Sequence, residues 1–215
     1  MTRQTVENVL DASPDHCHWG FFDASLSPVL TIQSGDEVTI RTVSGGPDML
    51  PGEGFHVPPE LLEIHKQGAP AMPGHLLTGP VAVAGAKPGD VLQVDILDVQ
   101  LRQDWGYNFI RPLAGTLPLD FPDRHRTILP LDAARGIATL PWGLELPLAP
   151  FFGVMAVAPP PQWGRISTIE PRKHGGNLDN KELVAGTTLF LPVWAEGALF
   201  SCGDGHGAQG DGEVC

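Results

Sequence analysis

The stretch that says most about the fold of this chain is Gly203-Asp204-Gly205-His206-Gly207-Ala208-Gln209-Gly210-Asp211-Gly212-Glu213. It directly follows an apolar segment, residues 189–200, so we expect it at the end of core strands. Side chains alternate between the two faces of a strand, which puts Asp204 and His206 on one face, and likewise Asp211 and Glu213. The glycines leave the other face nearly bare, so another strand or a small ligand can approach closely. The pattern favours a β protein with a site where its core strands end.

The same stretch carries the ligand types of a divalent metal site. Three carboxylates, an imidazole and an amide stand within ten residues. Zinc takes histidine nitrogen and carboxylate oxygen, and carboxylates this close would repel one another without a cation or protons. The alternative interpretation is a glycine-rich surface turn with solvated charges. The repeat of a calcium-binding β-roll does not recur.

Composition points to one β-rich domain. The 215 residues include 26 glycines and 22 prolines without a fixed period, which is typical of many short strands and turns. We therefore predict a mainly β fold, an antiparallel β-sandwich or roll with many hairpins and one or two short helices. The clearest helix signal lies at residues 58–66, where prolines come first, acids occupy the first turn and Lys66 stands late.

Two turn signals predict hairpins. Ser34-Gly35-Asp36 and Pro88-Gly89-Asp90 each separate two apolar runs, and we expect each turn aspartate to bond its own backbone. The segment 102–135 keeps no periodicity and predicts loops and short strands that cover a site. The remaining expectations are a turn at 172–181 and strands at 5–10, 29–32, 38–43, 81–83, 91–99, 137–140, 154–158, 187–192 and 198–202.

The charge and the cysteines exclude several classes of function. A net charge of -12 disfavours nucleic acid and anionic membrane surfaces as partners. No apolar run approaches the length that spans a bilayer, and the N-terminus lacks the apolar region of a secretory signal. Three cysteines without CxxC spacing fit a reducing compartment, so we expect a cytoplasmic protein.

A second polar cluster lies near the N-terminus, at Asp15-His16-Cys17-His18-Trp19-Gly20-Phe21-Phe22-Asp23. Two histidines, a thiol and two carboxylates among aromatic rings resemble a pocket wall. The alternative is a partly buried loop whose histidines bond to the backbone.

Several segments together resemble the acetamidase/formamidase family of small-amide hydrolases. They are Gly74-His75-Leu76-Leu77-Thr78-Gly79-Pro80, Gly85 to Asp90, Pro150 to Pro159, His174-Gly175-Gly176-Asn177-Leu178-Asp179 and the stretch 203–213. The resemblance covers roughly residues 15 to 215 in the family's order. It implies an all-β protein that hydrolyses a short aliphatic amide to carboxylate and ammonia with a bound divalent metal, zinc or, as the alternative, calcium.

The resemblance also bears on domains and assembly. It implies one domain over residues 1–215, which we subdivide into an N-terminal β part at 1–100 and a C-terminal β part at 101–215. Members of the family continue beyond the Gly-Asp-Gly-Glu segment. We therefore expect a C-terminally incomplete chain that forms a homo-oligomer, or a companion chain that supplies the missing part, since an exposed sheet edge associates.

Roles follow from the resemblance and from the chemistry of amides. A zinc-like ion held by Asp204, His206 and Asp23 would polarise the carbonyl and lower the pKa of bound water from 15.7 to about 7. Our candidates for acid–base catalysis are Glu213, Asp211 and His75, and His75 also serves as a ligand or an orienting group. The candidates for substrate binding are Asn177, Asp179 and Trp19.

Two rival functions stay open at this point. One is a cysteine nucleophile, Cys202, Cys215 or Cys17, although a thiol that ends an apolar strand is more often buried and inert. The other is a non-catalytic β-sandwich binding module stabilised by calcium, which prefers six to eight oxygen ligands and would leave His206 without a role.

Overall fold

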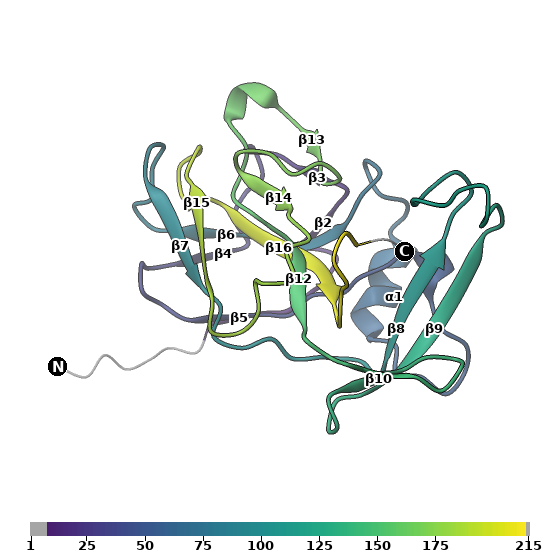
Figure 1. Cartoon of the computed structure of the whole chain (residues 1–215). Helices are drawn as coiled ribbons and strands as arrows, with labels where there is room; N and C mark the ends of the chain where they lie inside the picture. Colours follow the sequence, from purple (N-terminus) through teal and green to yellow (C-terminus); the bar gives the residue numbers. More distant parts are fainter. Residues whose placement is uncertain (1–7, 214–215) are drawn as a thin grey trace.

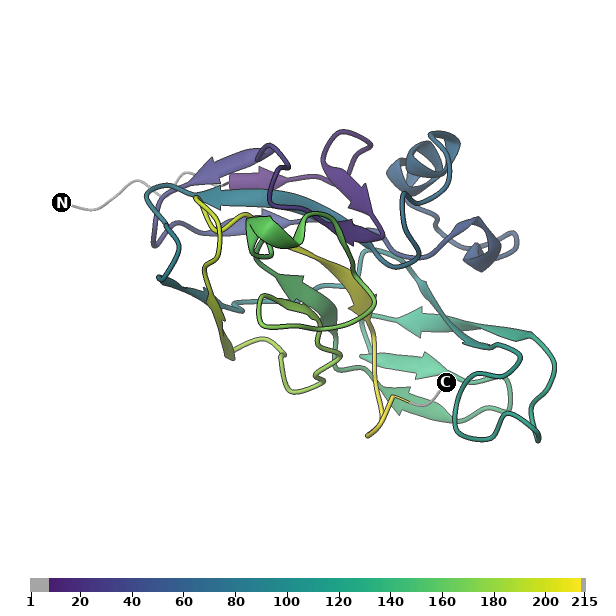
Figure 2. The same ribbon diagram turned by 90° about the horizontal axis from the view of Figure 1, so that it is seen from above.

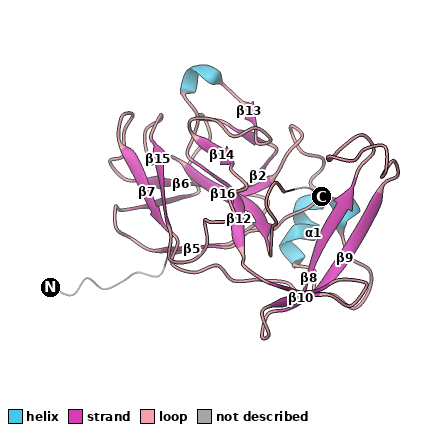
Figure 3. Cartoon of the chain, viewed as in Figure 1, coloured by secondary structure: helices cyan, strands magenta, loops and turns pink. Residues whose placement is uncertain are grey.

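The computed structural model describes residues 8–213, and within them the chain is built mainly of short strands (Figure 3). The helical elements are α1 (Pro59–Lys66) and the 3-10 turns η1 (Pro47–Met49) and η2 (Pro161–Trp163). The strands are β1 (Asn8–Leu10), β2 (Cys17–Trp19), β3 (Phe21–Phe22), β4 (Leu30–Ile32), β5 (Val38–Ile40), β6 (Leu76–Val83), β7 (Val91–Asp95), β8 (Trp105–Ile110), β9 (His125–Asp132), β10 (Ile137–Thr139), β11 (Glu145–Pro147), β12 (Phe151–Ala156), β13 (Ile166–Ser167), β14 (Gly175–Asn177), β15 (Thr188–Pro192) and β16 (Phe200–His206). The predicted mainly β fold with a short helix at 58–66 is confirmed.

A six-stranded sheet forms the centre of the molecule (Figure 1). Its order is β14-β12-β16-β6-β2, and β4 pairs with β6 outside this path. The strands β2, β4 and β6 come from residues 1–100, and β12, β14 and β16 come from 101–215. The two halves of the predicted subdivision therefore share one sheet, and the subdivision itself stays a prediction.

A four-stranded sheet, in the order β11-β10-β9-β8, lies at one end of the molecule. The yellow segment that follows β16 runs toward this sheet in both views (Figures 1 and 2). Three further pairs surround the centre, namely β1 with β5, β3 with β13 and β7 with β15. The site described below lies where the end of β16 meets the four-stranded sheet.

The largest core cluster packs against one face of the central sheet. It joins Met155 on β12 and Val157 just after it, Leu191 and Val193 at β15, and Phe200 and Cys202 on β16, all at most 8% exposed. Burying apolar side chains contributes on the order of 1.5–3 kcal/mol each. This core holds the apolar first half of β16 in the middle of its sheet. The polar end of the strand is therefore held in a defined position.

The two predicted hairpins are wrong. β4 pairs with β6 in parallel, β5 pairs with β1 in parallel, and β7 pairs with β15, so neither turn joins paired neighbours. The turns themselves form as predicted: Asp36 accepts from the amide of Gln33, and Asp90 accepts from the amide of Lys87. A local turn fixes the chain direction but not the strand that each arm pairs with.

The segment 102–135, expected as loops and short strands, instead forms the antiparallel β8–β9 hairpin, with six paired residues on each arm. The expected turn at 172–181 contains the short strand β14, and residues 5–7 of the first predicted strand lie outside the described residues. No helix among the described residues has the length and apolarity needed to cross a membrane.

The histidines of the second polar cluster, at residues 15–23, bond to the backbone, as our alternative interpretation expects. His16 bonds to the carbonyl of Asp11, and His18 donates from Nδ1 to the carbonyl of Phe21 at 2.6 Å. Because Nδ1 donates, Nε2 accepts from the hydroxyl of Ser201 at 3.0 Å. Burial lowers the pKa of His18 from 6.5 to about 4, so this bridge between β2 and β16 is built on a neutral imidazole.

We expect acid to weaken the fold through His18. The unfolded chain binds a proton on this residue below pH 6.5 and the native chain only below about pH 4. The contribution of His18 to the free energy of unfolding should therefore fall by about 3 kcal/mol as the pH falls through that window. Urea unfolding at pH 7 and pH 4.5 measures it, and His18→Gln should show a shallower fall. The exposed His125 gives a control, since His125→Gln should keep the wild-type slope; equal slopes for all three proteins would contradict the prediction.

Candidate active site

The end of β16 presents two polar side chains between β12 and β6. His206 is opposite Phe151 and Gly203 is opposite Val154, which puts Asp204 beside Gly153. Oδ2 of Asp204 lies 3.2 Å from Nε2 of His206. Asp204 has φ 55°, a left-handed conformation that aspartate tolerates better than most residues. The sequence alternation thus brings Asp204 and His206 together, as predicted.

Gly153 on β12 forms the floor under these side chains. A Cβ built on Gly153 would lie 2.6 Å from Oδ1 of Asp179, 2.6 Å from Oδ2 of Asp204 and 2.8 Å from Nε2 of His206. Three ligand-type atoms from separate segments therefore converge on one point above this glycine. Any larger residue there would fill the space between them.

Asp179 reaches this point from the loop after β14. The amides of Leu178 and Asp179 donate to the carbonyl of Gly153 at 2.8 and 3.1 Å. The side-chain amide of Gln209 donates to the carbonyl of Asp179 at 2.6 Å, so the segment after β16 holds the loop in place. The loop is fixed through its backbone, which leaves the Asp179 carboxylate free to face the centre.

Glu213 completes the group from the end of the described chain. Its carboxylate, the Asp179 carboxylate and the His206 ring offer ligand atoms that all lie within 4.8 Å of one another. Oδ1 of Asp179 is buried without a hydrogen-bond partner, and so are Oδ1 of Asn177 and Oε1 of Gln209. Buried acceptors without donors are costly, so they indicate a cation or a ligand that donates hydrogen bonds. We call Asp179, Asp204, His206 and Glu213 the acid–histidine cluster.

The carboxylates of this cluster repel one another, and the His206 ring attracts them. Burial raises the pKa of Asp179 to about 7, helped by the hydrogen bond and the charge of Glu213. Burial alone would raise the pKa of Asp204, but the hydrogen bond from His206 and the positive charge of the histidines lower it. Burial alone would lower the pKa of His206, but Asp204 and Asp179 raise it. A divalent cation would relieve the repulsion among the carboxylates, and the donor set fits one.

His75 faces the cluster from the start of β6. Its backbone amide donates to Oγ1 of the fully buried Thr168 at 2.8 Å, and Nδ1 lies 3.2 Å from the same oxygen. Nε2 lies 3.7 Å from Oδ2 of Asp204. Thr168 therefore fixes the ring so that its second nitrogen points at Asp204.

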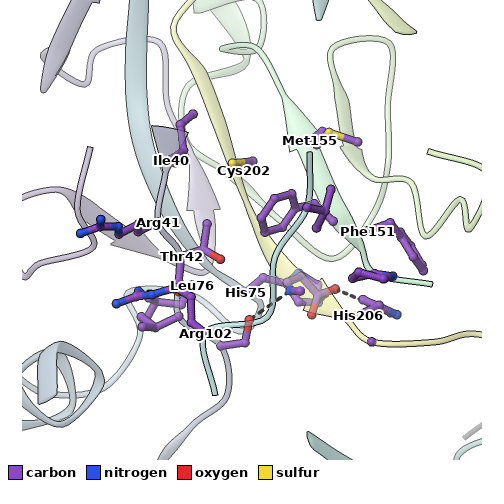
Figure 4. A pocket seen from close by; sticks show the side chains of 18 of the residues that line it. Ile40, Arg41, Thr42, His75, Leu76, Arg102, Phe151, Met155, Cys202 and His206 are labelled. Atoms are coloured by element: carbon purple, nitrogen blue, oxygen red, sulfur yellow. Dashed lines mark hydrogen bonds and ion pairs between the residues drawn. The ribbon is translucent and has the colours of Figure 1, made fainter. Parts of the chain in front are cut away.

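An open cavity of about 2140 Å³ gives access to the cluster. Its wall includes His75, Asn177, Asp204, His206 and Glu213, together with the face of β8. Figure 4 shows His75 and His206 on this wall with Phe151 beside His206. The site thus combines an open approach with buried, converging polar groups, which is the usual form of a small-molecule site.

Comparison with known proteins now identifies the family. The sequence profile of the Acetamidase/Formamidase family matches residues 26–166 and 162–215. This chain belongs to the acetamidase/formamidase family.

Two curated relatives in the acetamidase/formamidase family carry names that describe their activity. An acetamidase from Mycolicibacterium smegmatis is 28% identical over 66% of this chain and 49% of its own length. A formamidase from Methylophilus methylotrophus is 31% identical over 65% of this chain and 47% of its own. The chain therefore spans about half the length of the curated relatives it matches.

Solved acetamidase/formamidase structures have the same fold. The crystal structure of an acetamidase from Bacillus halodurans superposes with a TM-score of 0.79 and 33% identity, over 96% of this chain and 64% of that one. A predicted acetamidase/formamidase from Thermoanaerobacter tengcongensis gives 0.78 and 28%, over 97% and 64%. The family resemblance drawn from the sequence is confirmed.

Three predicted site residues of this family member lie apart from the cluster. Asp23 accepts hydrogen bonds from Ser25 and Arg165, and this pairing lowers its pKa, so its assignment as a metal ligand stays a prediction that these contacts do not support. Asp211 is 91% exposed and pairs with Lys181, because the chain leaves the sheet after His206 and the strand alternation no longer holds. Trp19 lines the cavity but stacks on His65.

Sequence reasoning missed the roles of Gly153 and Thr168 and the partner of Gln209. Gly153 lies within the quoted segment 150–159, where a single glycine interrupts an apolar strand. Such a glycine can mark the close approach of another group, and this signal was available. Thr168 and Gln209 act through contacts with residues 93 and 30 positions away, for which no local pattern exists.

Proposed function

We propose that this chain carries the active site of an amidase that hydrolyses a short amide to a carboxylate and ammonia. The observation that supports this most is the convergence of Asp179, Asp204 and His206 above Gly153, with His75 at its edge. The names of the curated relatives, an acetamidase and a formamidase, support the substrate class.

We propose a divalent metal at this point, with zinc as the first candidate and calcium as the alternative. Asp179, Asp204 and His206 would hold it, with Glu213 within reach. Nitrogen and carboxylate ligands together suit zinc better than calcium, which prefers a larger all-oxygen shell. When bound, such an ion polarises the amide carbonyl and lowers the pKa of water.

The residues of the chain have complementary roles in this proposal. Glu213 is the most exposed carboxylate of the cluster, so it takes the proton of the attacking water and delivers it to the leaving nitrogen. Asn177 offers an unpartnered Oδ1, which accepts a hydrogen bond from the substrate amide. His75, held by Thr168, keeps the Asp204 carboxylate in orientation.

The geometry does not favour a cysteine nucleophile. Burial raises the pKa of Cys202 to about 12 and also raises the pKa of Cys17, so neither forms a thiolate readily. Cys215 lies outside the described residues.

Assembly and location are further parts of the proposal. We keep a homo-oligomer or a companion polypeptide as a proposal; the match covers 64% of the length of the solved relatives. The outer side of the β7–β15 pair exposes Val91 and Phe190, each 61% accessible, and offers a surface for such a contact. A cytoplasmic location stays a prediction from the cysteine content.

The decisive experiment measures ammonia release from formamide and acetamide. We expect a chelator to remove the activity and zinc to restore it, with one ion per chain by elemental analysis. Activity that survives chelation but stops on thiol alkylation would transfer the role to a cysteine. The binding module would be favoured if the protein binds calcium but hydrolyses neither amide. The same result should then hold after reconstitution with the remaining third of a solved relative.

A further inference from the structure

The backbone at Asp204 has an unusual conformation in the middle of the acid–histidine cluster. Its φ of 55° lies in the left-handed region, which a residue with a side chain keeps only where its surroundings hold it. The peptide that follows Asp204 carries the amide of Gly205, and Oγ of Ser44 accepts a hydrogen bond from that amide at 3.1 Å. Ser44 lies in the loop after β5, 161 positions away in the sequence. The bond therefore fixes the peptide between Asp204 and Gly205 from a distant segment.

The strands beside β16 do not hold this peptide from both sides. On one side, β6 pairs with β16 only as far as Gly203. On the other side, β12 continues along β16 as far as His206. The ladder with β6 thus ends one residue before Asp204, and beyond that point Ser44 takes the place of a strand residue.

Ser44 is itself held by its neighbours in the chain. Val43, directly before it, is 4% exposed and belongs to a core cluster. On the other side, Nε2 of His65 on α1 donates to the carbonyl of Gly45 at 3.0 Å, because a carbonyl oxygen can only accept. The His65 ring stacks on Trp19, with centroids 5.7 Å apart. The position of the Ser44 hydroxyl is therefore supported by the core and by the helix.

We propose that Ser44 is a positioning residue of the active site, which keeps Asp204 and His206 in the direction that their convergence requires. It acts through the amide of the glycine between them. This inference rests on the proposed amidase function, because those two side chains are the members of the cluster that β16 carries. Groups that orient ligands or catalytic side chains typically change metal affinity or activity by about 10- to 100-fold when they are removed.

The alternative is that the bond only ties the loop to the sheet. Gly205 is exposed, so water can take the place of the Ser44 hydroxyl after a substitution, and the stability of the fold then changes little. A mobile water does not fix the direction of the peptide. The positioning role therefore predicts a loss of function without a loss of stability, which a purely structural contact does not.

The test compares Ser44→Ala with Ser44→Thr in the full chain. We expect Ser44→Ala to lower kcat for acetamide and zinc affinity each by about 10- to 100-fold, with KM within about 2-fold of wild type. Exchange of the Gly205 amide in the chelated protein should become about 3- to 10-fold faster, because one hydrogen bond is lost. Ser44→Thr keeps the acceptor oxygen and should restore kcat to within about 3-fold of wild type. The exposed Ser27 gives the matched control, and Ser27→Ala should change none of these quantities.

A second pair of variants tests the support from the helix. His65→Leu removes the donor to the Gly45 carbonyl, whereas His65→Gln keeps an amide donor. We expect His65→Leu to lower kcat by about 3- to 10-fold, in the same direction as Ser44→Ala, and His65→Gln to lower it less. If Ser44→Ala fails to fold, this pair decides.

The outcomes separate the positioning role from the amidase function. Faster exchange of the Gly205 amide in Ser44→Ala with wild-type kcat and zinc affinity would overturn the positioning role while the function stands. A raised KM with unchanged kcat would also overturn it, because Ser44 would then contact the substrate itself. Zinc affinity that falls in Ser44→Ala and returns in Ser44→Thr, in a protein that hydrolyses no amide, would support the positioning role and overturn the amidase function. A wild-type protein that neither binds zinc nor hydrolyses an amide would overturn both.

Discussion

Replacement of Gly153 by alanine is expected to abolish metal binding and to lower amide hydrolysis by at least about 100-fold. The added Cβ would lie within 2.8 Å of an atom of Asp179, Asp204 and His206 at once. Contacts this short force at least two of the three groups outward. A displacement of about 1 Å at a catalytic centre costs on the order of 100-fold in rate.

The stability of the variant tests whether the effect is local. Alanine in place of a strand glycine normally stabilises a fold by about 0.4–1 kcal/mol, whereas overpacking costs about 1–3 kcal/mol. We expect a net loss of about 1–2 kcal/mol in urea unfolding, which leaves the protein folded. Measuring zinc content and ammonia release on the folded variant then isolates the effect on the site.

Gly210, in the polar segment after β16, gives a matched control. Gly210 has open space around a built Cβ and no positive φ, so Gly210→Ala should keep both metal and activity. Wild-type zinc content in Gly153→Ala would contradict the proposed position of the metal. Loss of metal in both variants would mean that the loss does not come from the short contacts above Gly153.

How far the sequence predicts this site depends on how local each contact is. Asp204 and His206 are two residues apart on one strand, so the period of two brought them together without any knowledge of the fold. The same rule fails for Asp211, because the sheet ends at His206 and a turn takes over. The alternation of side chains between two faces holds only where strand hydrogen bonds keep the backbone extended.

Non-local contacts explain what the sequence could not provide. Strand pairing between β12 and β16 joins Gly153 to Asp204, which are 51 positions apart, and nothing near Gly153 indicates that partner. The hairpins expected at 29–43 and 81–99 were wrong for a related reason. Their turns form locally, but the parallel partner of β5 is β1, and the partner of β7 is β15.

Replacement of Asp179 by asparagine is expected to have opposite effects on stability and activity. Burial and Glu213 raise the pKa of this carboxyl to about 7, so ionising it in the metal-free fold is unfavourable. The native chain keeps the proton up to about pH 7 and the unfolded chain loses it near pH 3.8. The contribution of Asp179 to the free energy of unfolding of the chelated protein therefore falls as the pH rises from about 4 to 7, and the full penalty is present above 7.

Asparagine removes that penalty but also removes a proposed metal ligand. After allowance for solvent near this partly exposed loop, we expect chelated Asp179→Asn to be about 1–3 kcal/mol more stable than wild type at pH 8 and equal to it near pH 4. We expect zinc affinity and ammonia release to fall at least about 100-fold, because the neutral amide is a weaker ligand. Urea unfolding in a chelator at pH 4, 6 and 8 measures the first effect, and metal titration measures the second.

Asp120, exposed on the β8–β9 loop, provides the comparison that makes this result interpretable. Asp120→Asn should change neither quantity by more than about 0.5 kcal/mol, because exposed substitutions seldom do. An Asp179→Asn protein that is less stable than wild type at pH 8 would mean that His206 already compensates the charge of Asp179 without a cation. If Asp179→Asn is more stable than wild type but inactive, the repulsion among the carboxylates lowers the stability of the wild-type fold. The carboxylates are then kept for the function of the site, a trade-off that functional sites often show.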